Sequence, residues 1–481
     1  MKWTEINLTR NHWIAIGFSL IFVVLNSVLI ANEFFYFGLI PALLVVGLMF
    51  FTVPDKILIL IAFLTPLAVN LSSFEMDIGV SVPTEPLLAA LLLLIIAKLL
   101  YDRNLDKRVF LHPLSLTLYL YFIWMIITVF TSKFPVVSLK AFIAKMWFII
   151  PVYFFGIMVF KNPKNILYFV YAYIGGFIIV IAYTMIHHAM FDFTSESAHW
   201  VMSPFYNDHT SYGAMLALFI PFLTGILFSK FIKPMFKWII SGVLVLFLIA
   251  IVLSVSRAAW ASVLLAFGVW FLIYFKIKFK WVLSVSIIFL FLIFSFKDQI
   301  IMKMERNKQD AKGGLVQHVE SVSNVATDAS NLERLNRWGS ALRMFKSRPV
   351  FGWGPGTYQF VYAPFQKSYE KTVISTNVGN RGTAHSEYLL ILSEEGVVGG
   401  ISLVLIISLI ISTAISNQKR ITNPELRLLN LLLFLGLVTY MAHAVFNNFL
   451  DTDKAAIPFW GFVAGIVAIN IYNKPLSRQK N

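Results

Sequence analysis

The chain has 481 residues, of which 58% are hydrophobic and only 13% are charged. A soluble domain carries about a quarter of charged residues, so this composition excludes an ordinary soluble protein and indicates a polytopic membrane protein. The net charge of +15 fits cytoplasm-facing loops better than a nucleic-acid-binding surface, and the absence of cysteine excludes disulfides, thiol catalysis and thiolate metal sites.

Fourteen apolar segments are candidates for crossing a hydrocarbon core of about 30 Å. They lie at residues 13–31, 34–53, 57–71, 86–100, 114–130, 146–160, 166–186, 212–228, 238–255, 258–275, 281–296, 397–416, 428–446 and 455–472. Three of them are short. We therefore expect an all-α membrane protein with 12–14 transmembrane helices.

Lysine and arginine gather in alternate loops. The basic set comprises Arg103, Lys107, Arg108, Lys161, Lys164, Lys230, Lys233, Lys237, Lys276, Lys278, Lys280, Lys419, Arg420, Lys474, Arg478 and Lys480. The intervening loops, such as 72–85 and 447–454, contain few. The positive-inside rule therefore predicts that the basic loops and both termini are cytoplasmic and that the number of spans is even.

This orientation divides the chain into three parts. Residues 1–296 form about eleven spans with an outer loop at 187–211, residues 297–396 form a large outer loop, and residues 397–481 form about three spans and a basic tail. From Lys297 to Arg381 the large loop has 13 Lys/Arg against 7 Asp/Glu. Such an excess of positive charge suggests an anionic ligand.

Arg257 is the first candidate functional residue. It stands in the motif Ser256-Arg257-Ala258-Ala259-Trp260, between the spans 238–255 and 258–275 and at the outer membrane boundary. It could be a snorkelling boundary arginine. Outer boundaries seldom carry arginine, however, and the connection is too tight to hide the side chain, so we retain it as an anion-binding candidate.

A helix is predicted from Ser330 to Arg348, because a capping-box spacing opens it and Pro349 ends it. Arg334 lies near its apolar face and is expected to be held against the membrane body, where it needs an anionic ligand or a structural carboxylate. Arg343 lies on the opposite face and is expected to be solvated. The apolar face consists of Leu332, Leu335, Trp338, Leu342 and Phe345.

His385 precedes a helix that becomes the span starting near Val397. A titratable imidazole behind an arginine-rich loop suggests proton transfer beside an anionic substrate. The glycine cluster at 352–356 could bring N–H groups near a phosphate, although a plain turn is the simpler interpretation. The four histidines at 187, 188, 199 and 209 are read as ordinary loop residues, and His443, near the outer end of a span, is a secondary candidate.

In this order, the motifs resemble the bacterial O-antigen ligase and O-antigen polymerase superfamily over about residues 200–400. The matching pieces are Ser256–Trp260, Arg334-x-x-x-Trp338, Pro349–Gly356, and His385 followed by Gly396. The arginine motif of the ligases has leucine at the fourth following position. This chain has Trp338 after Arg334 and Ala261 after Arg257, so the choice between ligase and polymerase stays open.

The resemblance implies a GT-C-like fold and a metal-independent inverting glycosyltransferase without a cofactor. Its donor would be a glycan on undecaprenyl diphosphate at the periplasmic face of the inner membrane. The acceptor would be the lipid A core for the favoured ligase, or a second lipid-linked repeat for a polymerase. His385 would be the general base, Arg257 and Arg334 would bind the diphosphate, and Arg337 and His443 would be secondary candidates, with 297–396 as the periplasmic catalytic loop.

A polysaccharide-lipid transporter or flippase is the alternative from another class, since it would also need a basic path for a diphosphate lipid. It would be expected to show charges within the spans and a two-fold repeat, and neither is evident in the sequence. Membrane lipids are expected partners in either case, and nucleic acid is not.

Overall fold

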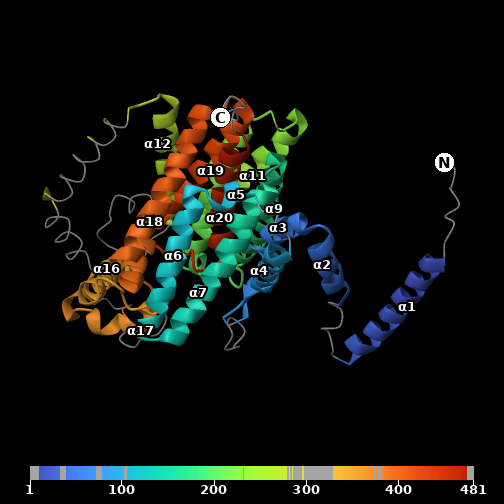
Figure 1. The fold of residues 1–481 in the computed structure, drawn as a ribbon, viewed down its shortest axis with the longest axis horizontal. Coiled ribbons are helices and arrows are strands. Elements are labelled where there is room, and N and C mark those ends of the chain that lie inside the picture. The colour runs from blue at the N-terminus through green and yellow to red at the C-terminus, as the bar shows by residue number, and fades with distance from the viewer. Residues whose placement is uncertain are drawn as a thin grey trace. The chain divides into compact units, whose positions relative to one another are not determined.

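A computed structural model describes residues 10–32, 40–71, 79–101, 106–230, 232–278, 281, 284, 295–296, 329–371, 375 and 382–473 (Figure 1). The chain forms two compact units, Met1–Ile57 and Leu58–Asn481. The predicted span 281–296 and the first third of the predicted outer loop lie almost entirely outside the described residues.

The first unit contains α1 (Arg10–Ala31) and α2 (Ile40–Thr52), and α3 (Pro54–Leu64) begins in it. The 13 residues of α2 rise about 20 Å, which is shorter than a hydrocarbon core. The first helix is longer, and its apolar stretch Ser19–Ala31 covers only part of it.

The predicted span 57–71 is wrong, because α3 stops at Leu64. The chain then turns, and β1 (Val69–Asn70) pairs antiparallel with β2 (Ser81–Val82). The physical reason lies in the Lys454 ammonium, which donates hydrogen bonds to the carbonyl oxygens of Thr65 (2.6 Å), Pro66 (3.1 Å) and Ala68 (2.5 Å). A buried cation thus takes over carbonyls that a continuing helix would have bonded internally.

Ten helices among the described residues are long and apolar enough to cross a membrane, which confirms the all-α polytopic fold. They are α4 (Thr84–Tyr101), α6 (Pro113–Phe130), α7 continued by η3 and α8 (Pro135–Val159), α9 (Pro163–Ala189), α10 (His209–Ile226), α11 (Pro234–Leu253), α12 (Arg257–Tyr274), α18 (Glu387–Arg420), α19 (Pro424–His443) and α20 (Asp453–Tyr472).

The span Pro135–Val159 includes η3 (Ile150–Phe155) and α8 (Gly156–Val159). The remaining described elements lie between spans and are α5 (Lys107–Phe110), η4 (Ser197–His199), α16 (Ala329–Ser347), α17 (Tyr358–Val361), η5 (Ala363–Phe365) and η6 (Ser368–Glu370). The π-helical η3 contains Pro151, whose missing N–H and bulky ring are incompatible with a regular helical ladder.

The helices α10, α19 and α20 form the centre of the second unit. Their close approach depends on glycine: a Cβ on Gly436 of α19 would lie 2.7 Å from the Leu218 carbonyl oxygen of α10. Asn417 of α18 donates to Asn430 of α19 (2.8 Å) and to the Ile466 carbonyl of α20 (2.9 Å). These buried amide bonds fix the register of three helices, so their ends are held firmly relative to one another.

The two ends of this helical body differ in charge. The described basic loops lie where α4, α12, α18 and α20 end. The opposite end carries the starts of α10, α12, α18 and α20 and the end of α19. Figure 1 shows α16 and α17 at the lower end of α18, where this helix starts. The described part of the segment that was predicted to form an outer loop, which contains α16 and α17, therefore lies at the end away from the basic loops.

We predict that the two ends face opposite sides of the membrane. In this cysteine-free chain, single cysteines at the exposed positions Ser368 and Lys161 provide the test. An impermeant thiol reagent applied to intact cells should label Ser368→Cys, whereas Lys161→Cys should react only after the membrane is opened. Labelling of both variants from the same side would contradict this arrangement.

Candidate functional site

A backbone clamp joins the glycine-rich loop to a break in α18. Gly396 has φ +69° and interrupts the helix, and the N–H of Val397 donates to the Pro349 carbonyl (2.8 Å). In return, Trp353 and Gly354 donate to the carbonyls of Ser393 (3.2 Å) and Glu394 (2.7 Å). The helix thus begins at Glu387, directly after His385 as expected, and continues into the predicted span 397–416 across the break at Gly396.

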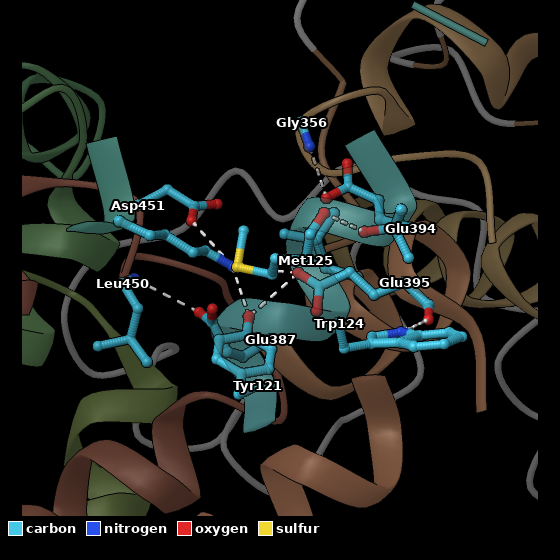
Figure 2. A network of polar contacts seen from close by, with 12 residues as sticks. Tyr121, Trp124, Met125, Gly356, Glu387, Glu394, Glu395, Leu450 and Asp451 are labelled. Atoms are coloured by element: carbon cyan, nitrogen blue, oxygen red, sulfur yellow. Dashed lines mark hydrogen bonds and ion pairs between the residues drawn. The ribbon is translucent and has the colours of Figure 1, made fainter. Parts of the chain in front are cut away.

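The glycines are required by this close approach. A Cβ on Gly396 would lie 2.0 Å from the Val350 carbonyl oxygen, and one on Gly352 would lie 2.3 Å from that of Glu394. The carboxylate of Glu394 accepts hydrogen bonds from the backbone N–H groups of Gly356 and Tyr358, each at 2.8 Å (Figure 2). These N–H groups bind a carboxylate of the chain itself. This favours the interpretation of the glycine cluster as a plain turn rather than as a phosphate-binding loop.

Helix α16 packs through a different face from the one predicted. Leu335 and Leu342 are 40% and 43% exposed, whereas Ala341 and Met344 are buried. The buried face also contains Glu333, Asn336, Arg337 and Ser340. The prediction considered only apolar spacing, but the partner segment 358–370 offers acceptors and a carboxylate, so a polar face can be buried without loss.

Two arginines of α16 are bound to carboxylates. Arg337 is buried, donates to Glu333 (2.6 Å), and lies over the Tyr362 ring at 4.0 Å. Arg343, which was predicted to be solvated, is partly buried and pairs with Glu370 at 2.5 Å. Glu333 is therefore occupied along the helix instead of closing the predicted capping box. Both pairs hold α16 against the following segment.

His385 lies just before α18 in the left-handed region, with φ +48°. Its N–H donates to the Thr383 hydroxyl (3.2 Å), and its carbonyl accepts the indole N–H of Trp338 (3.1 Å). Burial, reinforced by the charges of Arg334 and Arg337, lowers the pKa of the imidazole from 6.5 to about 4, against smaller opposing effects of Asp208 and Glu333. The imidazole is consequently neutral at physiological pH.

His443 and Arg334 lie in the same region. His443 is buried at the end of α19, accepts a hydrogen bond from the Asn447 amide (3.0 Å), and lies in electrostatic range of Arg334 and Asp208. Its ring also lies beside the backbone of Ala258. The structure thus brings Arg334, His385 and His443 together.

Arg257 is the first residue of α12, after a tight connection in which Val255 has φ +53°. Its neighbour Ala258 contacts His443, so Arg257 stands beside the same region. The start of α10 packs against that of α12, where a Cβ on Gly213 would lie 2.7 Å from Ser256 Cβ, and α18 starts beside the end of α19, where the Glu387 N–H donates to the Ala444 carbonyl (2.9 Å). The N-terminal dipoles of α10, α12 and α18 add positive potential to that of the arginines. The region is suited to an anion with a neutral base beside it.

Asp208 was not identified from the sequence. It caps α10, where its Oδ1 accepts hydrogen bonds from Thr210 and Ser211, both at 2.8 Å through the backbone. Its charge acts on both His385 and His443. The cap pattern Asp208-His209-Thr210 could have located the helix start, but no local signal indicated the distant histidines.

A second polar cluster, also missed by the sequence analysis, is buried between α6, α7 and α18. The Lys145 ammonium lies 3.5 Å from Glu395 and 3.8 Å from Asp451, and it donates to the Tyr121 hydroxyl (3.1 Å). Tyr121 in turn donates to Glu395 (3.0 Å). Figure 2 shows Glu387 and Asp451 converging on this cluster from different segments.

Almost no charges are evident within the predicted spans, but the helices at two of these spans do carry charges. The predicted spans 146–160 and 397–416 left Lys145, Glu394 and Glu395 outside, whereas α7 and α18 are longer and include them. The remaining histidines bond locally: His187 to the Val201 carbonyl, His188 to the Thr194 carbonyl, and His199 to His209.

The O-antigen ligase family model matches residues 242–404, about a third of the chain. The match includes Arg257, Arg334 and His385, and it confirms the resemblance to the O-antigen ligase and polymerase superfamily. It supports a glycosyl-transfer function that uses lipid-linked glycans. The comparison with curated proteins yields no match.

We predict that Lys145→Met destabilises the protein by about 3–5 kcal/mol, because removing the cation leaves buried carboxylates uncompensated. The midpoint of thermal unfolding in detergent measures the effect. Lys140→Met, at an exposed position of the same helix, is the matched control and should change little. Equal effects of the two substitutions would contradict a structural role for the buried pair, and Glu395→Gln should partly restore stability in the Lys145→Met background.

Proposed function

We propose that this chain is a glycosyltransferase that moves a glycan from undecaprenyl diphosphate to a sugar hydroxyl of an acceptor at the periplasmic face of the inner membrane. The observation that carries the proposal is that the neutral, half-buried His385 lies in electrostatic range of Arg334, inside the region that matches the O-antigen ligase family. A base and an anion-binding cation in electrostatic range are the two groups that this reaction needs.

The arginines would stabilise the leaving group. As the acceptor oxygen bonds to the anomeric carbon, the bond from that carbon to the diphosphate oxygen breaks and negative charge grows on the diphosphate. Arg334 and Arg257 would donate to it, and the N-termini of α10, α12 and α18 would add their dipoles. Inversion at the anomeric carbon follows from a single displacement, and no metal ion is required in this scheme.

His385 would remove the proton of the attacking hydroxyl. The arginine charges that help to depress its pKa are the charges that a bound diphosphate would offset. Substrate binding would then raise the pKa and make the imidazole a stronger base in the complex than in the free protein. Donor binding and base activation would be coupled through electrostatics alone.

Arg337 is better suited to positioning. Its ion pair with Glu333 and its contact with Tyr362 hold α16 in place, and its charge reaches His385 from there. His443 is buried beside Ala258 and would help to place Arg257 at the start of α12.

We favour an O-antigen ligase with the lipid A core as acceptor. The runner-up is an O-antigen or exopolysaccharide polymerase, for which the acceptor is a second lipid-linked repeat. The lipopolysaccharide ladder of a deletion strain separates the two: loss of all polymer on lipid A core supports the ligase, and retention of a single repeat supports the polymerase.

A lipid-linked polysaccharide transporter is the alternative from another class, and the buried charges of Lys145 and its partners are compatible with it. Purified protein that forms a new glycosidic bond would separate a transferase from a transporter.

For the orientation in the membrane, the positive-inside rule supports cytoplasmic termini and a periplasmic position for the end of the helical body that carries His385.

We predict that Arg334→Lys and Arg257→Lys each lose most transfer activity while the protein inserts and folds. Lysine keeps the charge but loses the planar two-pronged donor that fits a diphosphate. Transfer in vitro from a lipid-linked donor provides the measurement, with Arg348→Lys, at an exposed position, as the control. Activity within a few-fold of wild type in both variants would remove the diphosphate role.

We predict that His385→Ala lowers kcat by about two to four orders of magnitude and changes donor binding little. Because the base must be unprotonated, rates rise with pH through its pKa. The lowered pKa of about 4 places this limb in kcat/KM well below the 6–7 expected of an ordinary histidine, and the limb in kcat should lie higher. High activity in His385→Gln with the limb intact would instead make His385 a positioning residue.

A further inference from the structure

A cavity of about 80 Å³, lined by both polar and apolar side chains, adjoins the candidate site. Its walls come from the β1–β2 hairpin, the loop before α10, and the start of α20. Asp208 lines it, and the charge of this carboxylate acts on His385 and His443. Phe449 lines it as well, and its ring centroid lies 5.8 Å from that of His443. The cavity is therefore a neighbour of the reacting groups.

The lining combines hydrogen-bonding groups with aromatic rings. Asn207, Ser211 and Thr452 supply amide and hydroxyl groups, and Phe205, Tyr206 and Phe449 supply ring surfaces. A sugar presents hydroxyl groups around its edge and C–H groups on its faces, so it matches both kinds of surface. A space of this size admits several water molecules, which sugar hydroxyls could replace.

The charges of the cavity do not favour a phosphate. Its cation, Lys454, has its ammonium hydrogen-bonded to the carbonyls of Thr65, Pro66 and Ala68. The lining also includes the carboxylates of Asp208 and Asp453, which would repel an anion. The diphosphate is thus expected on the arginine side and an uncharged part of a substrate on this side.

Two groups in the cavity, Asp208 Oδ2 and the Asn207 amide, can bind a ligand. The other carboxylate, Asp453, is already bonded to the Thr84 hydroxyl and to the Lys454 N–H. In contrast, the side-chain hydrogen bonds of Asp208 within the described part of the chain all use Oδ1. Asn207 is exposed at the cavity, and its amide bonds to none of the described residues. Asp208 Oδ2 and the Asn207 amide can therefore accept from and donate to sugar hydroxyls.

We propose that this cavity is the subsite for the acceptor sugar, with Asn207 and Asp208 as its hydrogen-bonding residues and Phe449 as a ring surface between it and His443. The inference rests on the proposed function and adds the place of the acceptor to it. A sugar bound here would present a hydroxyl group to His385 from the side that carries the carboxylates, and the diphosphate would lie on the side that carries the arginines.

The test measures steady-state transfer by the purified full-length protein, with donor and acceptor varied separately. Asn207→Ala and Asp208→Asn should raise the KM for the acceptor at least about fivefold and leave the KM for the donor unchanged. Asparagine can still cap α10, so Asp208→Asn should preserve the fold. Ser203→Ala, at an exposed position of the same loop, is the control.

A binding measurement keeps the inference separate from catalysis. The probe is the free saccharide released by mild acid from the acceptor glycolipid of the encoding strain, and saturation-transfer NMR detects its contact with the protein. Wild type and Ser203→Ala should bind it, and Asn207→Ala should lose most of the signal.

Unchanged acceptor KM and unchanged saccharide binding in both variants would overturn the subsite while leaving the glycosyltransferase proposal intact. A rise in the donor KM alone would overturn the acceptor assignment. Binding that depends on Asn207 in a protein that transfers no glycan would support the subsite and count against the proposed function.

Discussion

The arrangement of the candidate site depends on main-chain hydrogen bonds between the loop 349–356 and the break in α18. At Gly396 the helix loses bonds of its own ladder. The Pro349 carbonyl and the N–H groups of Trp353 and Gly354 replace them. The loop follows α16 directly, and His385 precedes α18, so this clamp sets the position of Arg334 relative to His385. Glu394 strengthens it by binding two further N–H groups of the loop.

Electrostatics in this region combine two requirements that usually conflict. An anion-binding site needs positive charge, and a base needs to lose its proton. In the proposed mechanism Arg334 would serve both, because its charge adds to the effect of burial in lowering the pKa of His385 and would also bind the diphosphate. The carboxylates Glu333 and Asp208 moderate the effect from two directions. Arg343, on the same helix, is paired with Glu370 and is not among the charges that act on the imidazole.

Much of the fold could be predicted from the sequence, because apolar length and loop charge report directly on membrane helices. Arg257 lies where α11 and α12 join, although as the first residue of α12 and not between the helices, and Pro349 follows the end of α16 as expected. The errors share one cause. The early end of α3 depends on Lys454, almost 400 residues away, and the buried face of α16 depends on Glu370 and the acceptors near it. Partners that are distant in sequence leave no periodic signal.

The same limit applies to the site. Arg257, Arg334 and His385 stand in recognisable motifs, whereas Asp208 and the Lys145 cluster do not. Lys145 was read as lying outside a span because apolar runs were trimmed at charged residues. Ending a span at the first charged residue fails here, because carboxylates from α18 and from the loop after α19 compensate the charge of Lys145 within the helix.

The break at Gly396 also bears on how the protein tolerates its membrane. Transmembrane helices adjust their tilt to the thickness of the surrounding bilayer. In an unbroken 34-residue helix such an adjustment would swing His385 through a long lever arm. Here the segment 387–395 is fixed to the loop 349–356 and can keep its orientation while 397–420 leans. The geometry around His385 should therefore vary little between membranes of different lipid composition.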